Sequence, residues 1–224
     1  MTDFKSYIEI ILKYNVLSFG SFVTKAGRKS PFFFNTGNIS TAYGIGDVSE
    51  HYAGIIDKKF SKNFDNLYGP AYKGIPLAVS TSEKIAKLQN RDVSFTFNRK
   101  EIKDHGEGGV LIGRRYDKPS RVIIVEDVLS AGTSLRQSID FLRLQANVTI
   151  VGAVVGIDRQ ERGTGDVSAK KEIEQKYNIP IYSIVSLDQI IEYLTNRTVL
   201  GKTWIDDDTR ATIDAYRNQH TAKQ

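Results

Sequence analysis

Two periodicities of hydrophobic and polar residues alternate along the chain, and together they predict its secondary structure. Apolar positions recur at helical spacing over residues 6–17 and 48–60, as they do in amphipathic helices. Continuous apolar runs rich in valine and isoleucine, over residues 121–125 and 148–157, are typical of strands buried on both faces. The pattern predicts further strands over 65–68, 93–97 and 181–185, and further helices over 75–88, 133–144, 168–177, 187–194 and 207–217.

Strands that alternate with helices predict an α/β fold with a mainly parallel sheet flanked by helices. Such a sheet binds its ligands at the carboxyl ends of its strands, so chemically informative residues are expected directly after strands. Residues 20–31 are basic and rich in turn-forming residues, which predicts a turn that leads into the aromatic run at 32–34. With 224 residues and no internal repeat, the chain has room for one large domain or two small ones.

Composition and charge narrow the classes of protein that the sequence allows. The chain has 31 Lys and Arg against 26 Asp and Glu, a net charge of +5, without a run of five basic residues. That excess is too small and too scattered to predict nucleic-acid binding. The sequence has no cysteine, no apolar run near the roughly 20 residues that span a bilayer, and an N-terminus unlike a signal peptide. We therefore expect a cytoplasmic protein that binds neither nucleic acid nor membrane.

The segment with the most chemical information follows the strand predicted at 121–125. Glu126 and Asp127 end this strand, so the sheet delivers two adjacent carboxylates to its edge. Small and hydroxyl residues then lead into a predicted helix, whose first backbone N–H groups lack intrahelical partners and can bind an anion. Glycine lets the backbone approach that anion closely, and hydroxyls add donors. The predicted phosphate loop consists of Val128, Leu129, Ser130, Ala131, Gly132, Thr133 and Ser134.

Two common phosphate motifs are excluded at this loop. No Gly-Lys-Ser/Thr follows, as a Walker loop requires, and the Gly-x-Gly-x-x-Gly fingerprint of a dinucleotide site is missing. Two carboxylates beside a phosphate would repel it unless they bind another part of the same ligand. Ribose hydroxyls, bound directly or through Mg²⁺, are the natural candidates. The alternative is a strand that ends in a solvated acidic turn and only caps the helix.

The segment from Val122 to Ser134 resembles the diphosphate-ribose signature of type I phosphoribosyltransferases. The resemblance implies the fold of that family, with the carboxylates on the ribose hydroxyls and the loop around the 5-phosphate of phosphoribosyl pyrophosphate. It also implies a Mg²⁺ ion held mainly by phosphoribosyl pyrophosphate, near Glu126 and Asp127. Orotate phosphoribosyltransferases usually have Asp at the first of these positions and Thr at position 130, so Glu126 and Ser130 are mild departures.

A second informative segment spans residues 97–109, where Gly106, Gly108 and Gly109 favour a flexible loop. A cationic loop on glycine hinges suits a lid over a polyanion, although an ordinary solvated loop is the alternative. The segment closely resembles the catalytic loop of orotate phosphoribosyltransferases, apart from Ile102, where a smaller residue is usual. The resemblance places four cations of this loop on phosphoribosyl pyrophosphate, namely Arg99, Lys100, Lys103 and His105.

Residues 69–76 resemble the pyrophosphate-binding loop of the same family. This resemblance places Tyr72 and Lys73 at phosphoribosyl pyrophosphate, with the Lys73 ammonium on the pyrophosphate. Taken alone, Lys73 would be interpreted as a solvated turn residue.

The N-terminal segment carries the first argument about the base. Orotate is a planar pyrimidine with a carboxylate, so its site needs a cation, an aromatic face and hydrogen bonds. Residues 19–35 resemble the N-terminal hood of orotate phosphoribosyltransferases. The resemblance places Lys25 between the base and the leaving group, and it places Phe33 and Phe34 in the wall under the base. Core packing is the alternative for at least one of the aromatic residues at 32–34.

Arg159 and Ser130 carry the second argument about the base. Arg159 follows the strand predicted at 148–157, and its planar guanidinium can bind a carboxylate bidentately, which suits orotate better than a neutral base. An ion pair with Glu161 is the alternative. Purine-using relatives commonly have an aspartate at position 130, whereas Ser130 offers a hydroxyl to the base.

The resemblance as a whole implies an orotate phosphoribosyltransferase that uses Mg²⁺ and joins orotate to phosphoribosyl pyrophosphate. It implies a homodimer in which the basic loop of one subunit closes over the active site of the other. Rival functions are a phosphoribosyltransferase for another base, such as uracil, and a regulatory ligand-binding protein of the same fold. The expected catalytic residues are Lys25, Lys103, His105 and Asp127.

We expect the whole chain, residues 1–224, to form one phosphoribosyltransferase domain. Residues 1–40 would supply an N-terminal helix and the base-binding hood, and residues from about 45 to 195 the α/β core. Residues 196–224 would form a C-terminal helix and tail, which contribute nothing to the resemblance.

Overall fold

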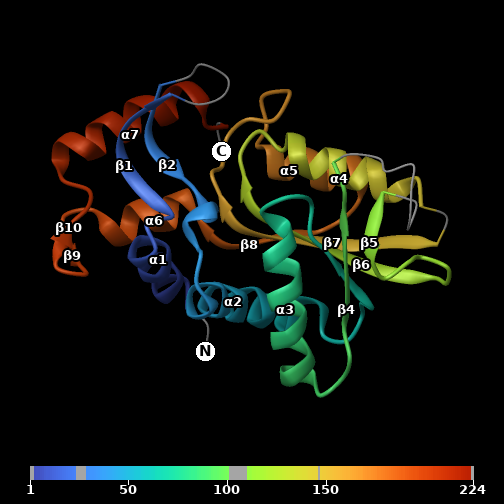
Figure 1. Cartoon of the computed structure of the whole chain (residues 1–224). Helices are drawn as coiled ribbons and strands as arrows, with labels where there is room; N and C mark the ends of the chain where they lie inside the picture. The colour runs from blue at the N-terminus through green and yellow to red at the C-terminus, as the bar shows by residue number, and fades with distance from the viewer. Residues whose placement is uncertain (1–2, 24–28, 101–109, 146, 223–224) are drawn as a thin grey trace.

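A six-stranded sheet lies at the centre of the molecule (Figure 1), as the α/β prediction requires. The computed structural model describes residues 3–23, 29–100, 110–145 and 147–222. The strands are β3 Asn66–Tyr68, β4 Ser94–Asn98, β5 Leu111–Gly113, β6 Ser120–Leu129, β7 Val148–Asp158 and β8 Ile181–Ser186. Their order is β5-β4-β3-β6-β7-β8, and every neighbouring pair is parallel except β4 and β5. The strands β4, β3, β6, β7 and β8 are thus parallel to one another, and their carboxyl ends lie at the same edge of the sheet.

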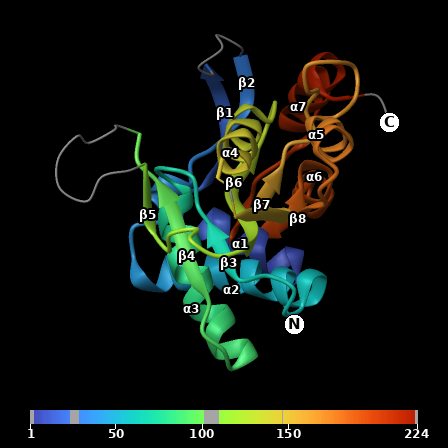
Figure 2. The same ribbon diagram turned by 90° about the vertical axis from the view of Figure 1, so that its right-hand side faces the viewer.

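Helices cover both faces of this sheet, as Figures 1 and 2 show. Alternate residues of β6 enter different cores, since side chains alternate along a strand: Ile123 and Val125 join one buried cluster, and Val122 and Ile124 the other. The first cluster includes side chains of α1 Phe4–Lys13, α2 Ala42–Phe60 and α3 Gly74–Gln89, and the second those of α4 Thr133–Arg143 and α5 Ala169–Tyr177.

None of the helices in the described part of the chain is long and apolar enough to cross a membrane.

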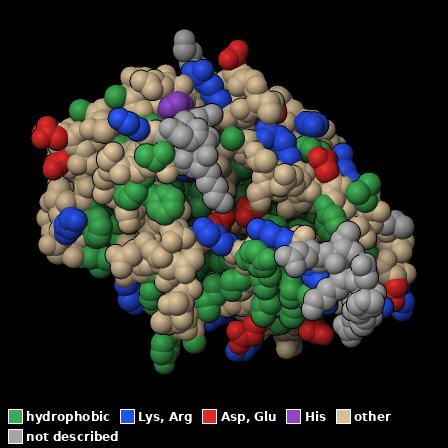
Figure 3. Space-filling model, turned by 45° about the horizontal axis from the view of Figure 1, so that its top comes forward, with side chains coloured by type: hydrophobic (Ala, Val, Ile, Leu, Met, Phe, Trp, Pro, Cys, Tyr) green, Lys and Arg blue, Asp and Glu red, His purple; other side chains and the backbone are tan. Residues whose placement is uncertain are grey.

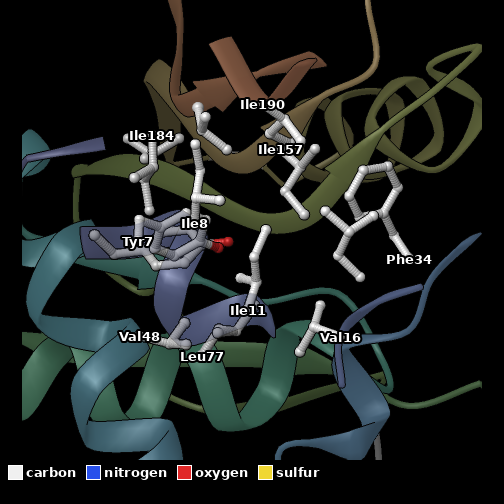
Figure 4. Packing of buried hydrophobic residues seen from close by; sticks show 14 of the residues in the cluster. Tyr7, Ile8, Ile11, Val16, Phe34, Val48, Leu77, Ile157, Ile184 and Ile190 are labelled. Carbon is white, nitrogen blue, oxygen red and sulfur yellow. The ribbon is translucent and has the colours of Figure 1, made fainter. Parts of the chain in front are cut away.

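Helix α1 supplies the middle of the larger core. Figure 4 shows Tyr7, Ile8 and Ile11 among side chains from α2, α3, β7, β8 and α6 Leu187–Leu194. The helix ends at Lys13, four residues before the predicted end, because Asn15 adopts a left-handed φ of 53° that a helix cannot continue through. The apolar residues after that point leave the helical pattern and enter the next strand.

An antiparallel hairpin of β1 Leu17–Val23 and β2 Lys29–Phe34 stands beside the sheet. The turn predicted over 20–31 is therefore wrong at both ends, where the chain is extended and paired, with Phe22 opposite Ser30 and Val23 opposite Lys29. The many turn-forming residues concealed these strands from the sequence pattern. Helix α7 Asp207–His220 packs behind β2, and the rings of Phe32 and Tyr216 meet edge to face at 5.4 Å.

Several short or glycine-containing elements were missed by the sequence pattern. Helix α2 begins six residues before the predicted start, because the Thr41 hydroxyl accepts a hydrogen bond from the Gly44 N–H and caps the helix. Gly44 and Gly46 weaken the helical signal in that first turn. Four other elements are too short to show a periodicity of hydrophobic residues: β5, the 3₁₀ turn η1 Thr36–Asn38, β9 Thr198–Val199 and β10 Lys202–Thr203.

Candidate functional site

Strand β6 carries the acidic pair within the sheet, not after it. The predicted strand ended at the pair, whereas β6 continues to Leu129 and pairs with β7 as far as Asp158. Side chains alternate along a strand, so Glu126 and Asp127 point to opposite sides. Glu126 contacts the first turn of α4, and Asp127 faces η1 and the loop before α3. The edge of the sheet thus holds two nearly buried carboxylates, 6% and 9% exposed, with separate partners.

Asp127 is held by two groups from different parts of the chain. The Thr36 hydroxyl donates a hydrogen bond of 2.6 Å to Oδ2 of Asp127, and the Lys73 ammonium lies 3.6 Å from the same oxygen. The other carboxylate oxygen accepts the Val128 N–H at 2.8 Å. Since the Lys73 side chain is 46% exposed, its ion pair is solvated and weak, and the ammonium can move to another anion at little cost.

Glu126 lies in a drier place. Its Oε2 accepts a hydrogen bond of 2.8 Å from the Ser134 hydroxyl, and the Tyr52 hydroxyl donates to its backbone carbonyl, also at 2.8 Å. Burial, followed by the charge of Asp127, raises the pKa of the Glu126 carboxyl to about 8. At neutral pH this carboxyl therefore retains its proton, so the acidic pair carries less negative charge than its two residues suggest.

Two buried tyrosine hydroxyls lie beneath the acidic pair, and that of Tyr52 donates to its backbone. A Cβ atom on Gly156 of β7 would lie 2.4 Å from the Tyr7 hydroxyl, 2.5 Å from the Tyr52 hydroxyl and 2.9 Å from the Asp127 carbonyl oxygen. These distances are too short for any side chain, so glycine is required where α1, α2 and β6 meet. Burial raises the pKa of both phenols, which keeps both hydroxyls protonated.

The predicted phosphate loop leads into α4 with its backbone donors available. Gly132 has a left-handed φ of 81° and precedes the first turn of α4, where no side chain caps the backbone N–H groups. These N–H groups can donate hydrogen bonds to an anion, as helix N-termini commonly do. Arg136 donates to the Ala131 carbonyl at 2.6 Å and to Glu172 at 2.8 Å, which ties the loop to α5.

The loop before α3 and the start of the basic segment lie side by side. Oδ1 of Asn98 accepts hydrogen bonds of 2.9 Å from both the Tyr68 hydroxyl and the Ala71 N–H. The Lys100 ammonium lies 4.5 Å from the centre of the Tyr72 ring. Nε of Arg99 is buried and has no hydrogen-bond partner among the described residues. The structure therefore places Arg99 and Lys100 beside the loop that holds Tyr72 and Lys73.

Arg159, at the end of β7, is nine-tenths buried beside the hairpin. Its Nη2 lies 2.6 Å from Oε1 of Glu161 and donates to the Tyr216 hydroxyl at 3.1 Å. The ion pair with Glu161, left open by the sequence, is thus present, although buried. Nε of Arg159 has no partner within the described residues, so this guanidinium keeps donor capacity for a ligand.

The three consecutive phenylalanines of β2 do not share one face. Phe32 and Phe34 are buried, and their rings lie 4.9 Å and 5.9 Å from the Arg159 guanidinium carbon. Phe33 is 41% exposed and stacks on Phe22, with ring centres 5.5 Å apart. Because neighbouring side chains of a strand point to opposite sides, the rings of Phe33 and Phe34 do not form one continuous wall. Core packing, the alternative for this run, applies to Phe32 and Phe34, which both belong to the larger buried cluster.

The space around the acidic pair is an open polar hollow. Figure 3 shows a hollow on one face of the molecule, with some acidic side chains inside it and Lys and Arg side chains near its edge. A pocket of about 210 Å³ beside it is lined by residues that include Thr36, Tyr72 and Lys73. A larger pocket of about 440 Å³ lies beside Ser168 and Arg217 and contains none of the predicted site residues. Pocket size alone would therefore have missed this polar site.

The structure gathers most of the predicted site residues at the carboxyl edge of the sheet, and it adds three that the sequence analysis missed. The missed residues are Thr36, Tyr52 and Tyr216, whose hydroxyls reach Asp127, Glu126 and Arg159. Each contact joins residues more than 50 positions apart, so no local pattern reveals it. Three predicted catalytic residues, Lys25, Lys103 and His105, lie outside the described residues.

An acidic pair beside an uncapped helix N-terminus, at the end of a mainly parallel sheet, is the arrangement expected of a type I phosphoribosyltransferase. In agreement, the protein-family model described as "Phosphoribosyl transferase domain" matches residues 35–182. That match includes the acidic pair, both loops and Arg159, and it stops before α7.

Comparison with individual proteins narrows the class. The orotate phosphoribosyltransferase of Clostridium beijerinckii is 43% identical over 219 residues, which are 98% of each chain. That of Thiobacillus denitrificans is 46% identical over 196 residues, 87% of this chain and 90% of the other. The crystal structure of the Francisella tularensis orotate phosphoribosyltransferase has a TM-score of 0.78 and 36% identity, and the match covers 96% of this chain and 99% of that one. The chain belongs to the orotate phosphoribosyltransferase family.

The raised pKa of Glu126 predicts how stability depends on pH. The carboxyl titrates near 4.5 in the unfolded chain and near 8 in the folded one, so between these values the folded state holds a proton that the unfolded state lacks. The stabilisation that the Glu126 proton gives the folded state is complete at pH values below the pKa of the carboxyl in the unfolded chain. It is lost as the pH rises through the pKa of the carboxyl in the folded chain. Relative to Glu126→Gln, the wild-type free energy of unfolding should fall by more than about 1 kcal/mol between about pH 5 and 8.5.

Urea titrations of the ligand-free protein over this pH range measure that difference. Glu172→Gln is the matched control, because hydrogen bonds from Thr164 lower the pKa of Glu172 to about 2, well below the range tested. The control should differ from wild type by a constant amount. A constant difference for Glu126→Gln as well would contradict the buried, protonated carboxyl.

Proposed function

We propose that this protein transfers the 5-phosphoribosyl group from phosphoribosyl pyrophosphate to orotate, giving orotidine 5′-monophosphate and pyrophosphate. The reaction belongs to the biosynthesis of pyrimidine nucleotides. The observation that carries the proposal is the arrangement at the ends of β6 and β7. There, an acidic pair and an uncapped helix N-terminus lie at the same sheet edge as a buried arginine whose Nε has no partner among the described residues.

The ribose phosphate is assigned to the end of β6. The 5-phosphate would accept hydrogen bonds from the backbone of the phosphate loop and the first turn of α4. The ribose hydroxyls would donate to the carboxylate of Asp127 and to the protonated carboxyl of Glu126, whose oxygens already accept hydrogen bonds from Thr36 and Ser134. Lys73, loosely paired with Asp127, would then turn to the pyrophosphate. Binding in this way exchanges one counterion of Asp127 for a ribose hydroxyl.

The residues present fit a Mg²⁺ ion that arrives with the substrate. Carboxylate and hydroxyl oxygens near Asp127 are ligands that Mg²⁺ prefers. No group of three or more His, Cys, Asp and Glu able to hold a metal occurs within the described ranges, so phosphoribosyl pyrophosphate would supply most of the ligands. When bound, the ion would neutralise charge on the pyrophosphate.

Orotate is assigned to the space between the hairpin and the end of β7. Arg159 would bind the orotate carboxylate, with its face against the rings of Phe32 and Phe34 and its Nε still unpaired. Ser130 would offer a hydroxyl to the base, and Lys25 would lie between the base and the leaving group. Catalysis follows from holding the ring nitrogen and the anomeric carbon together while cations stabilise the departing pyrophosphate.

The basic segment would supply those cations across a dimer interface. Arg99 and Lys100 lie beside the pyrophosphate loop, and Lys103 and His105 follow them in sequence. We propose that the protein is a homodimer and that Lys103 and His105 act at the active site of the partner subunit. A two-fold interface makes this exchange reciprocal, so each dimer has two composite sites.

An activity assay with matched substrates tests the proposed reaction. Orotate should be consumed with phosphoribosyl pyrophosphate and Mg²⁺, whereas uracil, hypoxanthine and adenine should react with kcat/KM at least about 100-fold lower, because they leave Arg159 without a carboxylate. Arg159→Ala should raise the KM for orotate far more than that for phosphoribosyl pyrophosphate. Equal use of uracil and orotate, or full activity in excess chelator, would refute the assignment.

Subunit mixing tests the shared site. Lys103→Ala and Arg159→Ala should each be nearly inactive, and a mixed dimer should contain one doubly damaged site and one intact site. Random exchange makes about half of the dimers mixed, so activity should recover to roughly a quarter of wild type. Native mass spectrometry must show that mixed dimers form. If they form and activity does not recover, the basic loop serves its own subunit.

A further inference from the structure

Helix α7 brings a tyrosine hydroxyl to the buried arginine of the base site. The Tyr216 hydroxyl accepts a hydrogen bond of 3.1 Å from Nη2 of Arg159 and donates one of 2.8 Å to Oε1 of Glu161. Arg159 and Glu161 also form an ion pair of 2.6 Å, so the three side chains close a triangle. All three residues are buried, which makes each contact stronger than it would be in water.

The same tyrosine also fixes the aromatic side of this cluster. Its ring meets Phe32 edge to face, with an angle of 78° between the ring planes, and the Arg159 guanidinium lies over the Phe32 ring. Tyr216 therefore packs against the surface on which the guanidinium rests and hydrogen-bonds to one of its nitrogens. Two independent contacts thus restrict the orientation of Arg159.

The hydroxyl decides how much of the arginine fork remains for a ligand. Of the three guanidinium nitrogens, Nη2 is engaged by Glu161 and Tyr216, whereas Nε is buried without a partner among the residues described. A carboxylate this close to an arginine favours a bidentate pair with two parallel hydrogen bonds. By accepting from Nη2 and donating to Oε1 of Glu161, Tyr216 satisfies both partners and opposes such a closed pair. The Nε donor of the fork is left for a second carboxylate.

We infer that Tyr216 is a positioning residue that keeps the Arg159 fork open for the carboxylate of the base. The inference rests on the proposed function and extends it to the C-terminal helix, which the family match over residues 35–182 does not reach. Without the hydroxyl, Glu161 competes with the incoming carboxylate for the guanidinium. Removal of the hydroxyl therefore weakens the binding of the base and leaves the binding of phosphoribosyl pyrophosphate unchanged.

Steady-state kinetics of Tyr216→Phe test this inference, because the substitution keeps the ring on Phe32 and removes only the hydroxyl. The KM for orotate should rise about tenfold, as expected for the loss of a hydrogen bond to a charged group. The KM for phosphoribosyl pyrophosphate and kcat at saturating orotate should change by less than about twofold. Arg159→Ala, measured in parallel, gives the size of the effect when the guanidinium itself is lost.

Two controls separate positioning from a general loss of structure. Tyr193→Phe removes a tyrosine hydroxyl bonded to another carboxylate, that of Glu9 at 2.7 Å, and should leave the KM for orotate unchanged. Ile213→Val shortens a fully buried side chain of α7 and should lower the melting temperature without a selective change in that KM.

The outcomes distinguish this inference from the proposed function. Orotate turnover by wild type with an unchanged orotate KM in Tyr216→Phe overturns the role of Tyr216 alone. The role of Tyr216 is also overturned if Ile213→Val raises the KM for orotate selectively, because any loss of stability in α7 would then have this effect. Failure of wild type to use orotate overturns the proposed function itself.

Discussion

The burial of two neighbouring carboxylates at the end of β6 is the constraint on which the rest of this site depends. Removing carboxylates from water is costly unless they are neutralised or hydrogen-bonded. Here Glu126 keeps a proton and is bonded by Ser134, while Asp127 is bonded by Thr36 and faces Lys73. The result is a pair of fixed acceptors whose one counterion is solvated and easily exchanged. A ligand that offers hydroxyls and brings its own cation suits such a pair.

The surrounding fold follows from this constraint. The Tyr52 hydroxyl donates to the backbone of the pair, and the hydroxyls of Tyr7 and Tyr52 fit there only because Gly156 has no side chain. The turn η1 brings Thr36 from the end of the hairpin to Asp127, so the segment proposed to cover the base also supports the proposed ribose site. One strand further, β7 ends at a second costly charge, Arg159, which Glu161 and the hairpin rings stabilise. Both buried charges therefore lie at the same sheet edge.

Local chemistry in the sequence predicted much of this arrangement, and contacts between distant segments account for the rest. The apolar run of β6 and the glycine before α4 are local signals, and the strand, the loop and the helix are present, although β6 extends to Leu129 and includes the first two residues of the predicted loop. The hairpin was missed because turn-forming residues concealed its alternation. The partners of Asp127 and Arg159, Thr36 and Tyr216, lie 91 and 57 positions away, and only the packing of α7 and η1 brings them close. Even the family resemblance gave no role to the C-terminal helix.

The central claim, that the acidic pair binds a ribose diol, is tested most directly by a cycle in which ligand and protein are changed together. Calorimetry would compare ribose 5-phosphate with its 2,3-dideoxy analogue, for wild type and for Asp127→Ala. The phosphate contacts are the same in all four combinations. We expect wild type to bind the diol at least about tenfold more tightly than the analogue, and the variant to discriminate less than about twofold. Equal discrimination by both proteins would show that the diol is bound elsewhere and would contradict this account.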